Sequence, residues 1–345
     1  KCHLGPDHPQ KEIYEESKHG VAYRDLKDHM NLNSKEWVLG KDYTQAPTCA
    51  TCHMSGNTQN DGKITHDPGR RISWTNRPPI SQVMDTDLNG KVVTETDPAK
   101  RQSLVAHSWE DKRNEMKQVC SHCHTPNYVN AFHKQYDDFV VNYNEKFAKP
   151  GKKIMDLLAA QSLLTKTQFD EEIEWTWFYL WHHEGRRARH GASMMAPDYA
   201  HWHGMYEVAE RFYMELIPMA REITHHAREN GQADAAAQVD ELIDSILARP
   251  EHEWFEKQKK LADDAAANTT AAVAVPVSQP PVEPPLDTPA GSSPEEASTG
   301  NENSAANESS AGNGAEQPDS NSLRDDSPRE NSLRNGAPAG NGNDV

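Results

Sequence analysis

The chain has 345 residues, and its 53 acidic against 36 basic residues give a formal net charge of −17 at pH 7. This balance argues against nucleic acid as a partner, because a nucleic-acid-binding surface needs a basic stripe or patch. The sequence contains no run of about 20 apolar residues, so it predicts no transmembrane helix. Five cysteines and 18 histidines stand out instead.

All five cysteines belong to one kind of motif. Complete C-x-x-C-H pentapeptides occupy residues 49–53 and 120–124, and residues 1–3 read as the end of a third copy, C-x-K-C-H. This motif attaches c-type haem: the thiols form thioethers with the haem vinyl groups, and the histidine ligates the iron. Zinc sites and redox C-x-x-C motifs do not explain a histidine directly after the second cysteine in every copy.

These motifs predict a multihaem c-type cytochrome. The cysteines expected to form haem thioethers are Cys2, Cys49, Cys52, Cys120 and Cys123. The expected proximal iron ligands are His3, His53 and His124. Because haem c is attached outside the cytoplasm, we expect a periplasmic or equivalent compartment. Because the first motif is cut, we expect the chain to be the C-terminal part of a longer protein.

Each haem iron also needs a distal ligand, or an open position for substrate. His19 and His66 follow proximal histidines at short intervals in polar, turn-like sequence, which favours distal ligation over a role as surface histidines. Four further histidines compete for the remaining positions, namely His107, His133, His190 and His203. We retain His190 and His203 with the first two as candidate distal ligands.

We expect a mainly α fold in three parts. Residues 1–150 form the haem region with little regular structure, since haems replace much of the hydrophobic core. Lys-Pro-Gly at residues 149–151 predicts a break, after which residues 151–264 form a long-helix oligomerisation domain. Residues 265–345 lack aromatic residues, histidine, cysteine and lysine. Such a composition buries too little apolar surface to fold, so we expect a disordered acidic tail.

Local signals place the helices of residues 151–264. Thr167, followed by Asp170, predicts a helix start before the run 171–189. Pro197 is expected in the first turn of the next helix, where its missing N–H costs little. Pro218 should kink that helix, and the Asn-Gly pair at residues 230–231 should end it.

Two further segments are candidates for chemistry. Asp7 and His8 lie in a proline-framed loop directly after the first haem motif, where a carboxylate and an imidazole could exchange protons over a haem. A capped turn explains the same loop equally well. Residues 194–204, M-M-A-P-D-Y-A-H-W-H-G, read from periodicity alone as a helix start with core aromatic residues.

Taken together, these residues resemble one family closely, the octahaem hydroxylamine oxidoreductases. The resemblance covers residues 1 to about 260 and rests on the haem motifs and on residues 2–9, 16–20, 71–74, 195–199 and 202–204. It implies a homotrimer whose subunits each carry eight c-type haems. Seven of these have two histidine ligands, and the motif of the eighth, catalytic haem lies upstream of this chain, so the chain alone is expected to be inactive.

The resemblance also implies roles for single residues. Tyr199 matches the tyrosine that crosslinks to the catalytic haem of the neighbouring subunit, and Asp7 and His8 match the distal-pocket pair. The implied reaction is oxidation of hydroxylamine to nitric oxide or nitrite, with electrons passing through the other haems to a soluble c-type cytochrome. A hydrazine-oxidising relative and a non-catalytic electron-transfer protein remain alternatives. Tyr199 counts against a reductive relative, since such relatives lack the tyrosine.

Overall fold

The computed structural model describes residues 9–35, 38–56, 64–255, 257–258 and 260–261. The expected mainly α fold is confirmed in this part of the chain, where helices dominate. Its sheet consists of two short strands, β1 (Trp74–Thr75) and β2 (Gln82–Val83), which pair antiparallel with Trp74 opposite Val83. The tail predicted for residues 265–345 lies outside the described residues.

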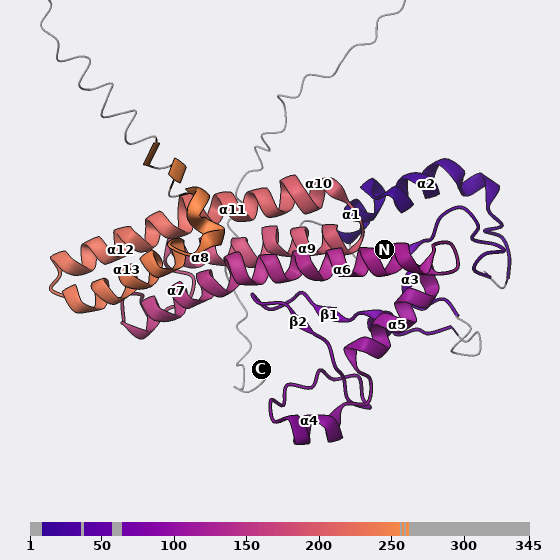
Figure 1. Cartoon of the computed structure of the whole chain (residues 1–345), viewed down its shortest axis with the longest axis horizontal. Coiled ribbons are helices and arrows are strands. Elements are labelled where there is room, and N and C mark those ends of the chain that lie inside the picture. Colours follow the sequence, from indigo (N-terminus) through magenta and orange to yellow (C-terminus); the bar gives the residue numbers. More distant parts are fainter. Residues whose placement is uncertain (1–8, 36–37, 57–63, 256, 259, 262–345) are drawn as a thin grey trace, which may run out of the picture. The chain divides into compact units, whose positions relative to one another are not determined.

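The haem region contains short helices joined by loops. In chain order these are α1 (Gln10–Glu16), α2 (Lys18–Leu26), η1 (Lys27–His29), α3 (Cys49–Met54), η3 (Pro68–Arg71), α4 (Pro98–Leu104) and α5 (Trp109–Cys120). Side-chain caps explain where several begin: Ser17, Thr48, Asp97 and Ser108 each accept a backbone N–H from the following turn. α3 and α5 pack against each other (Figure 1), which brings the two complete haem motifs together.

A long helical run follows. It consists of α6 (Pro126–Tyr143), the π-helical turn η4 (Asn144–Ala148) and α7 (Lys149–Ala160). The break predicted at residues 149–151 is therefore wrong, because the helix continues through Pro150. A proline ring crowds a regular helical turn, but the wider π turn directly before it relieves that crowding. The domain boundary at residue 150 falls inside this run, and the division into domains stays a prediction.

The remaining helices follow between residues 172 and 252. They are α8 (Glu172–Phe178), η5 (Tyr179–Glu184), α9 (Gly185–Ser193), α10 (Pro197–Ala200), η6 (His201–Tyr206), α11 (Glu207–Arg211), η7 (Phe212–Leu216), α12 (Ile217–Glu229), α13 (Ala233–Leu247) and η8 (Pro250–His252).

The local signals in this region are largely confirmed. Pro197 opens α10, and α12 ends at Glu229, followed by Gly231 with a φ of 81°. α8 starts later than the Thr167 signal indicated, because its capping box is formed by Glu171 and a glutamate three residues further on. At Pro218 a π-helical turn, η7, again precedes the proline.

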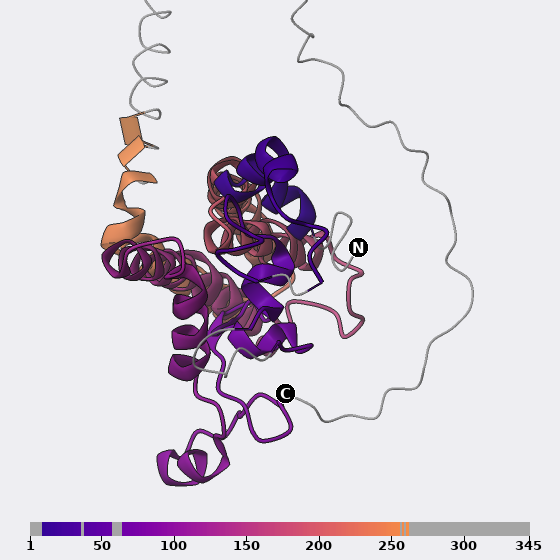
Figure 2. The same ribbon diagram turned by 90° about the vertical axis from the view of Figure 1, so that its right-hand side faces the viewer.

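The long helices share one apolar core. Phe147, Leu158, Phe212, Leu216 and Ile243 are each at most 3% exposed and come from η4, α7, η7 and α13. α12 packs on α13 and α13 on α7 (Figure 1). At the other end α1 contacts α9 and α10. In the turned view of Figure 2, the indigo helices from the start of the described chain lie beside reddish helices from later in the chain. Within the part of the chain that the structure describes, no helix combines the length and apolarity needed to span a bilayer.

Candidate haem sites

The motif at residues 49–53 forms one short helix. α3 begins with a capping box in which Thr48 and Thr51 each bind the other's backbone N–H. Helical geometry places Cys49 and Cys52 on the same side, because residues three apart are neighbours on a helix surface. None of the four cysteines that the structure describes forms a disulfide. The two thiols of α3 would therefore be able to bind one and the same haem.

His53 is held in the tautomer that an iron ligand needs. Its Nδ1 lies 3.2 Å from the carbonyl oxygen of Pro68, at the start of η3. A carbonyl only accepts hydrogen bonds, so Nδ1 carries the proton and Nε2 carries the lone pair. Metal-binding histidines commonly donate their second ring N–H in this way. The structure therefore supports His53 as a proximal ligand.

The second motif lies at the end of α5. The backbone N–H groups of Cys123 and His124 both donate to the carbonyl of Cys120, at 3.1 and 3.0 Å, which folds the motif into a tight turn. The ring of His124 stacks on Tyr128, with centroids 4.7 Å apart. The ring of His19, from α2, lies 5.9 Å from that of His124.

The separation of His19 and His124 fits one metal ion between them. A metal–imidazole bond is about 2 Å long and each ring adds roughly 1 Å between its nitrogen and its centroid, so His19 and His124 are close enough that both would be able to hold the same iron. Burial, and after it the charge of His124, lowers the pKa of His19. The His19 imidazole is therefore neutral at pH 7 and can donate a lone pair. The structure thus brings a sequence-predicted distal ligand to the last haem motif.

A buried arginine joins the two motifs. The side chain of Arg71 donates from Nη1 to the carbonyl of Cys52 at 3.0 Å, and its Nε lies 3.9 Å from a carboxylate oxygen of Glu115 on α5. Arg70 holds the same carboxylate through Nε at 2.9 Å and through Nη2 at 3.0 Å. Only 2% of Arg71 is exposed. η3 therefore fixes the first attachment helix to the second.

Both motifs fit covalently bound haem. Each offers two thiols and a histidine directly after them, which is the donor set of haem c. Burial, and after it the proximity of Cys120, raises the pKa of the Cys52 thiol to about 12. Because Cys52 and Cys120 are close enough for one thiol to influence the pKa of the other, haems attached at the two motifs would be neighbours. When bound, such haems supply one-electron redox chemistry, and the protein tunes it through ligands and burial.

The other predicted ligands lie in less decisive surroundings. His66 is exposed just before η3. On α9, Nδ1 of His190 lies 3.2 Å from Nε2 of Gln10. Both stay predictions as distal ligands. The predicted residues Cys2, His3, Asp7 and His8 lie outside the described residues.

His133 has a more suggestive environment than the sequence indicated. It is 8% exposed, and among the residues that the structure describes neither of its ring nitrogens has a hydrogen-bond partner. Burial lowers its pKa to about 4, so it is neutral at pH 7. Buried imidazoles normally find a partner, which keeps His133 among the candidate iron ligands. His107, in contrast, is exposed, and its backbone pairs with Thr86.

Tyr199 lies in α10, against α1. Its backbone N–H donates to Oε1 of Glu16 at 3.1 Å. Burial, and after it the charges of Glu12 and Glu16, raises the pKa of the phenol, so it is protonated at pH 7. The ring of His203 lies 5.7 Å away. His203 is itself half exposed, and its Nδ1 lies 3.0 Å from Glu207, so its role as a distal ligand also stays a prediction.

Sequence reasoning did not identify Arg71, Glu115 or Glu16 as site residues. Arg71 and Glu16 belong to the segments 71–74 and 16–20 that carry the family resemblance, but their partners lie far away in the chain. Nothing in the local sequence states which carbonyl or N–H a distant side chain will bind. The sequence shows only that Arg71 follows another arginine and that Glu16 precedes Ser17, the cap of α2. Neither observation predicts a distant partner.

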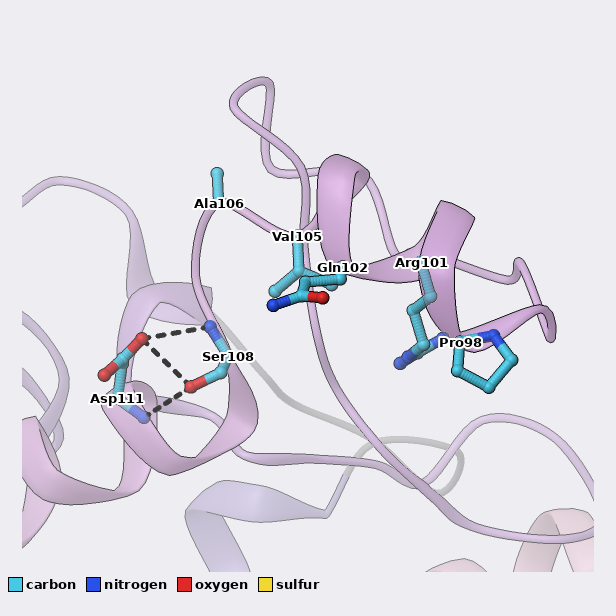
Figure 3. A pocket seen from close by; sticks show the side chains of 7 residues that line it. All are labelled: Pro98, Arg101, Gln102, Val105, Ala106, Ser108 and Asp111. Carbon is cyan, nitrogen blue, oxygen red and sulfur yellow. Dashed lines mark hydrogen bonds between the residues drawn. The ribbon is translucent and has the colours of Figure 1, made fainter.

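A hollow of about 470 Å³ beside α4 lies apart from these residues. Three of its polar side chains have partners: Ser108 and Asp111 bind each other in the capping box of α5 (Figure 3), and Arg101 binds Asp85. The residues that line it include none of the candidate haem ligands.

Comparison with known sequences indicates the same cofactor. A family model described as "Seven times multi-haem cytochrome CxxCH" matches residues 1–171. A probable nitrite reductase–hydroxylamine oxidoreductase fusion protein of Kuenenia stuttgartiensis is 31% identical over 144 residues, which are 40% of this chain and 16% of that protein. The chain is thus a multihaem c-type cytochrome, and its cofactor is haem c.

Solved structures share the fold. A chain of a reducing HAO-like protein complex of Kuenenia stuttgartiensis is 20% identical with a TM-score of 0.53, covering 67% of this chain and 56% of that chain. A hypothetical multiheme protein is 21% identical with a TM-score of 0.50, covering 68% and 54%. The chain therefore shares the fold of an HAO-like protein, where HAO stands for hydroxylamine oxidoreductase. It spans only 16% of the curated relative and little more than half of these solved chains.

Proposed function

We propose that this chain is part of a multihaem enzyme that oxidises hydroxylamine to nitric oxide or nitrite and passes the electrons to a soluble c-type cytochrome. The observation that carries the proposal is the setting of Tyr199. The phenol is partly exposed at the start of a helical run, and its backbone is tied to α1, which directly follows the Asp7–His8 segment. A tyrosine held this way is available to a group presented by a neighbouring subunit.

Different residues of the protein would provide the covalent link to haem, the proton acceptors and the haem ligands. Tyr199 would form the covalent link to the catalytic haem of a neighbouring subunit. Asp7 and His8 would accept protons as the substrate loses electrons, because a carboxylate and an imidazole can both act as bases near neutral pH. The ligands His53 and His124 would hold two haems for conduction.

A homotrimer is the proposed assembly. Trp202 is 63% exposed, Tyr206 54% and Met214 66%, and all three follow one another on the run from η6 to η7. Residues four apart share a helix face, so a large apolar surface lies open beside Tyr199. Exposed aromatic surface of this kind is typical of subunit contacts. An acceptor cytochrome with a basic surface would be attracted by the net charge of −17.

The test uses the full-length holoprotein. Hydroxylamine is added to the oxidised protein, and haem reduction is followed by absorption. We expect rapid reduction, together with a covalent haem–protein link between subunits that survives denaturing electrophoresis. Tyr199→Phe should abolish the link, whereas Tyr206→Phe, at an exposed tyrosine on the same helical run, should leave it intact.

Other outcomes would identify the alternatives. Reduction by hydrazine in preference to hydroxylamine would favour the hydrazine-oxidising alternative. If neither hydroxylamine nor hydrazine reduced the protein, the electron-transfer alternative would be correct. If the reduced protein were reoxidised by nitrite and hydroxylamine did not reduce it, the reductive direction would be correct and the proposal wrong.

A further inference from the structure

The backbone leading into Tyr199 is strained and lacks a cap of its own. Met195 has a φ of 61°, in the left-handed region that costs a non-glycine residue free energy. Ala196, the residue before α10, has no side chain that can accept a hydrogen bond from the first turn. A strained turn with an uncapped helix start persists only where the surroundings hold it.

Two neighbouring segments provide that support. From α9, Gly191 approaches so closely that a Cβ on it would lie 2.6 Å from the carbonyl carbon of Tyr199. The carbonyl of Gly191 also accepts the N–H of Ala196 at 2.9 Å. From α1, the carboxylate of Glu16 accepts the N–H of Tyr199 at 3.1 Å. An anionic acceptor at the start of a helix is favourable both as a cap and through the helix dipole.

The segment that carries Glu16 is itself firmly placed. The next residue, Ser17, caps α2 by accepting the N–H of Gly20 at 3.1 Å, and its hydroxyl donates to the carbonyl of Tyr14 at 2.6 Å. Gly20 has no space for a side chain, because a Cβ there would lie 1.9 Å from the same carbonyl oxygen. His19 follows in the same turn and faces the second haem motif.

We propose that Glu16 is a positioning residue for Tyr199: its carboxylate caps the helix start in place of a local side chain and thereby fixes the direction of the phenol. The inference rests on the proposed function for its consequence, the crosslink, but the positioning itself can be measured separately. The segment 16–20 therefore contacts both Tyr199, through Glu16, and the second haem motif, through His19.

The experiment compares three variants of the full-length holoprotein. Glu16→Ala removes the acceptor, and Glu16→Gln keeps a neutral one. Glu15→Ala is the matched control, because Glu15 is exposed and pairs with Lys11 one turn earlier on α1. Amide hydrogen exchange of the peptide spanning residues 196–204 reports the backbone, and the yield of linked subunits on denaturing gels reports the phenol. The absorption spectrum of the bis-histidine haems checks that His19 remains in place.

For Glu16→Ala we expect exchange at Tyr199 to become about fivefold faster, the typical effect of a lost cap. The crosslink yield should fall several-fold, Glu16→Gln should restore most of both, and Glu15→Ala should change neither. An unchanged exchange rate in Glu16→Ala would overturn the inference, and so would faster exchange with a full crosslink yield. If the unmodified protein forms no crosslink, the proposed function fails, and the exchange rates alone decide whether Glu16 positions Tyr199.

Discussion

His19, on α2, and His124, in the turn after α5, are far apart in the chain, yet their ring centroids are 5.9 Å apart. Because both imidazoles are this close to the second haem motif, we expect them to hold the iron of the haem attached at Cys120 and Cys123, which would then be low-spin. Replacing His19 with alanine should convert that haem to a high-spin form, measured by electron paramagnetic resonance and absorption. The control is His29→Ala, at an exposed histidine shortly after α2. An unchanged low-spin signal would assign the distal position to another histidine.

The same pair predicts a pH dependence. Burial lowers the pKa of His19, so its neutral form is favoured in the folded protein. Ligation should therefore persist as the pH falls through the usual histidine pKa of about 6.5, and be lost only below it. A pH titration of the low-spin absorption bands checks this. A transition centred near or above 6.5 would contradict the burial of His19.

Arg71 and Arg70 should differ sharply in their contribution to stability, although both contact Glu115. Arg71→Met leaves the carbonyl of Cys52 without a donor, and an orphaned buried acceptor costs about 1–3 kcal/mol. Arg70 is 39% exposed in its side chain, so Arg70→Met should cost about 1 kcal/mol or less. Denaturant unfolding of the two variants makes the comparison, and a larger loss for Arg70→Met would refute the assignment.

Gly151→Ala should destabilise the helical core. Alanine is the better helix former by up to about 1 kcal/mol, but its Cβ would lie 2.6 Å from the ring of Trp177 and 3.3 Å from Leu216. Overpacking of this kind costs about 1–3 kcal/mol, so the steric term wins. The midpoint of thermal unfolding should fall, whereas Lys152→Ala, at an exposed pair with Asp156 on the same helix, should change it little.

His252 should make the protein sensitive to mild acid. It is fully buried beside Tyr213, and burial lowers its pKa to about 4. Its stabilising contribution is complete above the unfolded-state pKa of 6.5 and is lost as the pH falls from there toward 4, because only the unfolded state then binds the proton. The loss is on the order of 3 kcal/mol.

Unfolding curves at several pH values test this effect. His252→Gln, which cannot be protonated, should flatten the pH dependence between 6.5 and 4. His133 has a similarly lowered pKa and acts in the same window, so part of the slope should remain. A slope identical to that of the unmodified protein would show that His252 is not buried as the structure has it.

The sequence correctly predicted those features that depend on a few neighbouring residues. Pro197 at a helix start and Gly231 at a helix end follow from backbone geometry alone, and the haem motifs follow from the chemistry of thiols and imidazole. The break predicted at Pro150 is wrong, because the π turn that accommodates the proline is set by the packing around it. The partner of His19 could not be predicted, since spacing in the chain points toward His3 and only the folded arrangement brings His124 close.

The short segment 16–20 has a consequence for how the protein matures. With His19 as an iron ligand, a haem bound at the second motif would add one more constraint to a segment that Ser17 and Gly20 already hold. Glu16 passes that constraint on to the backbone of Tyr199. Loading of this haem and seating of the tyrosine would then be coupled during maturation, so that a chain without the haem would present a less rigid tyrosine to its neighbour.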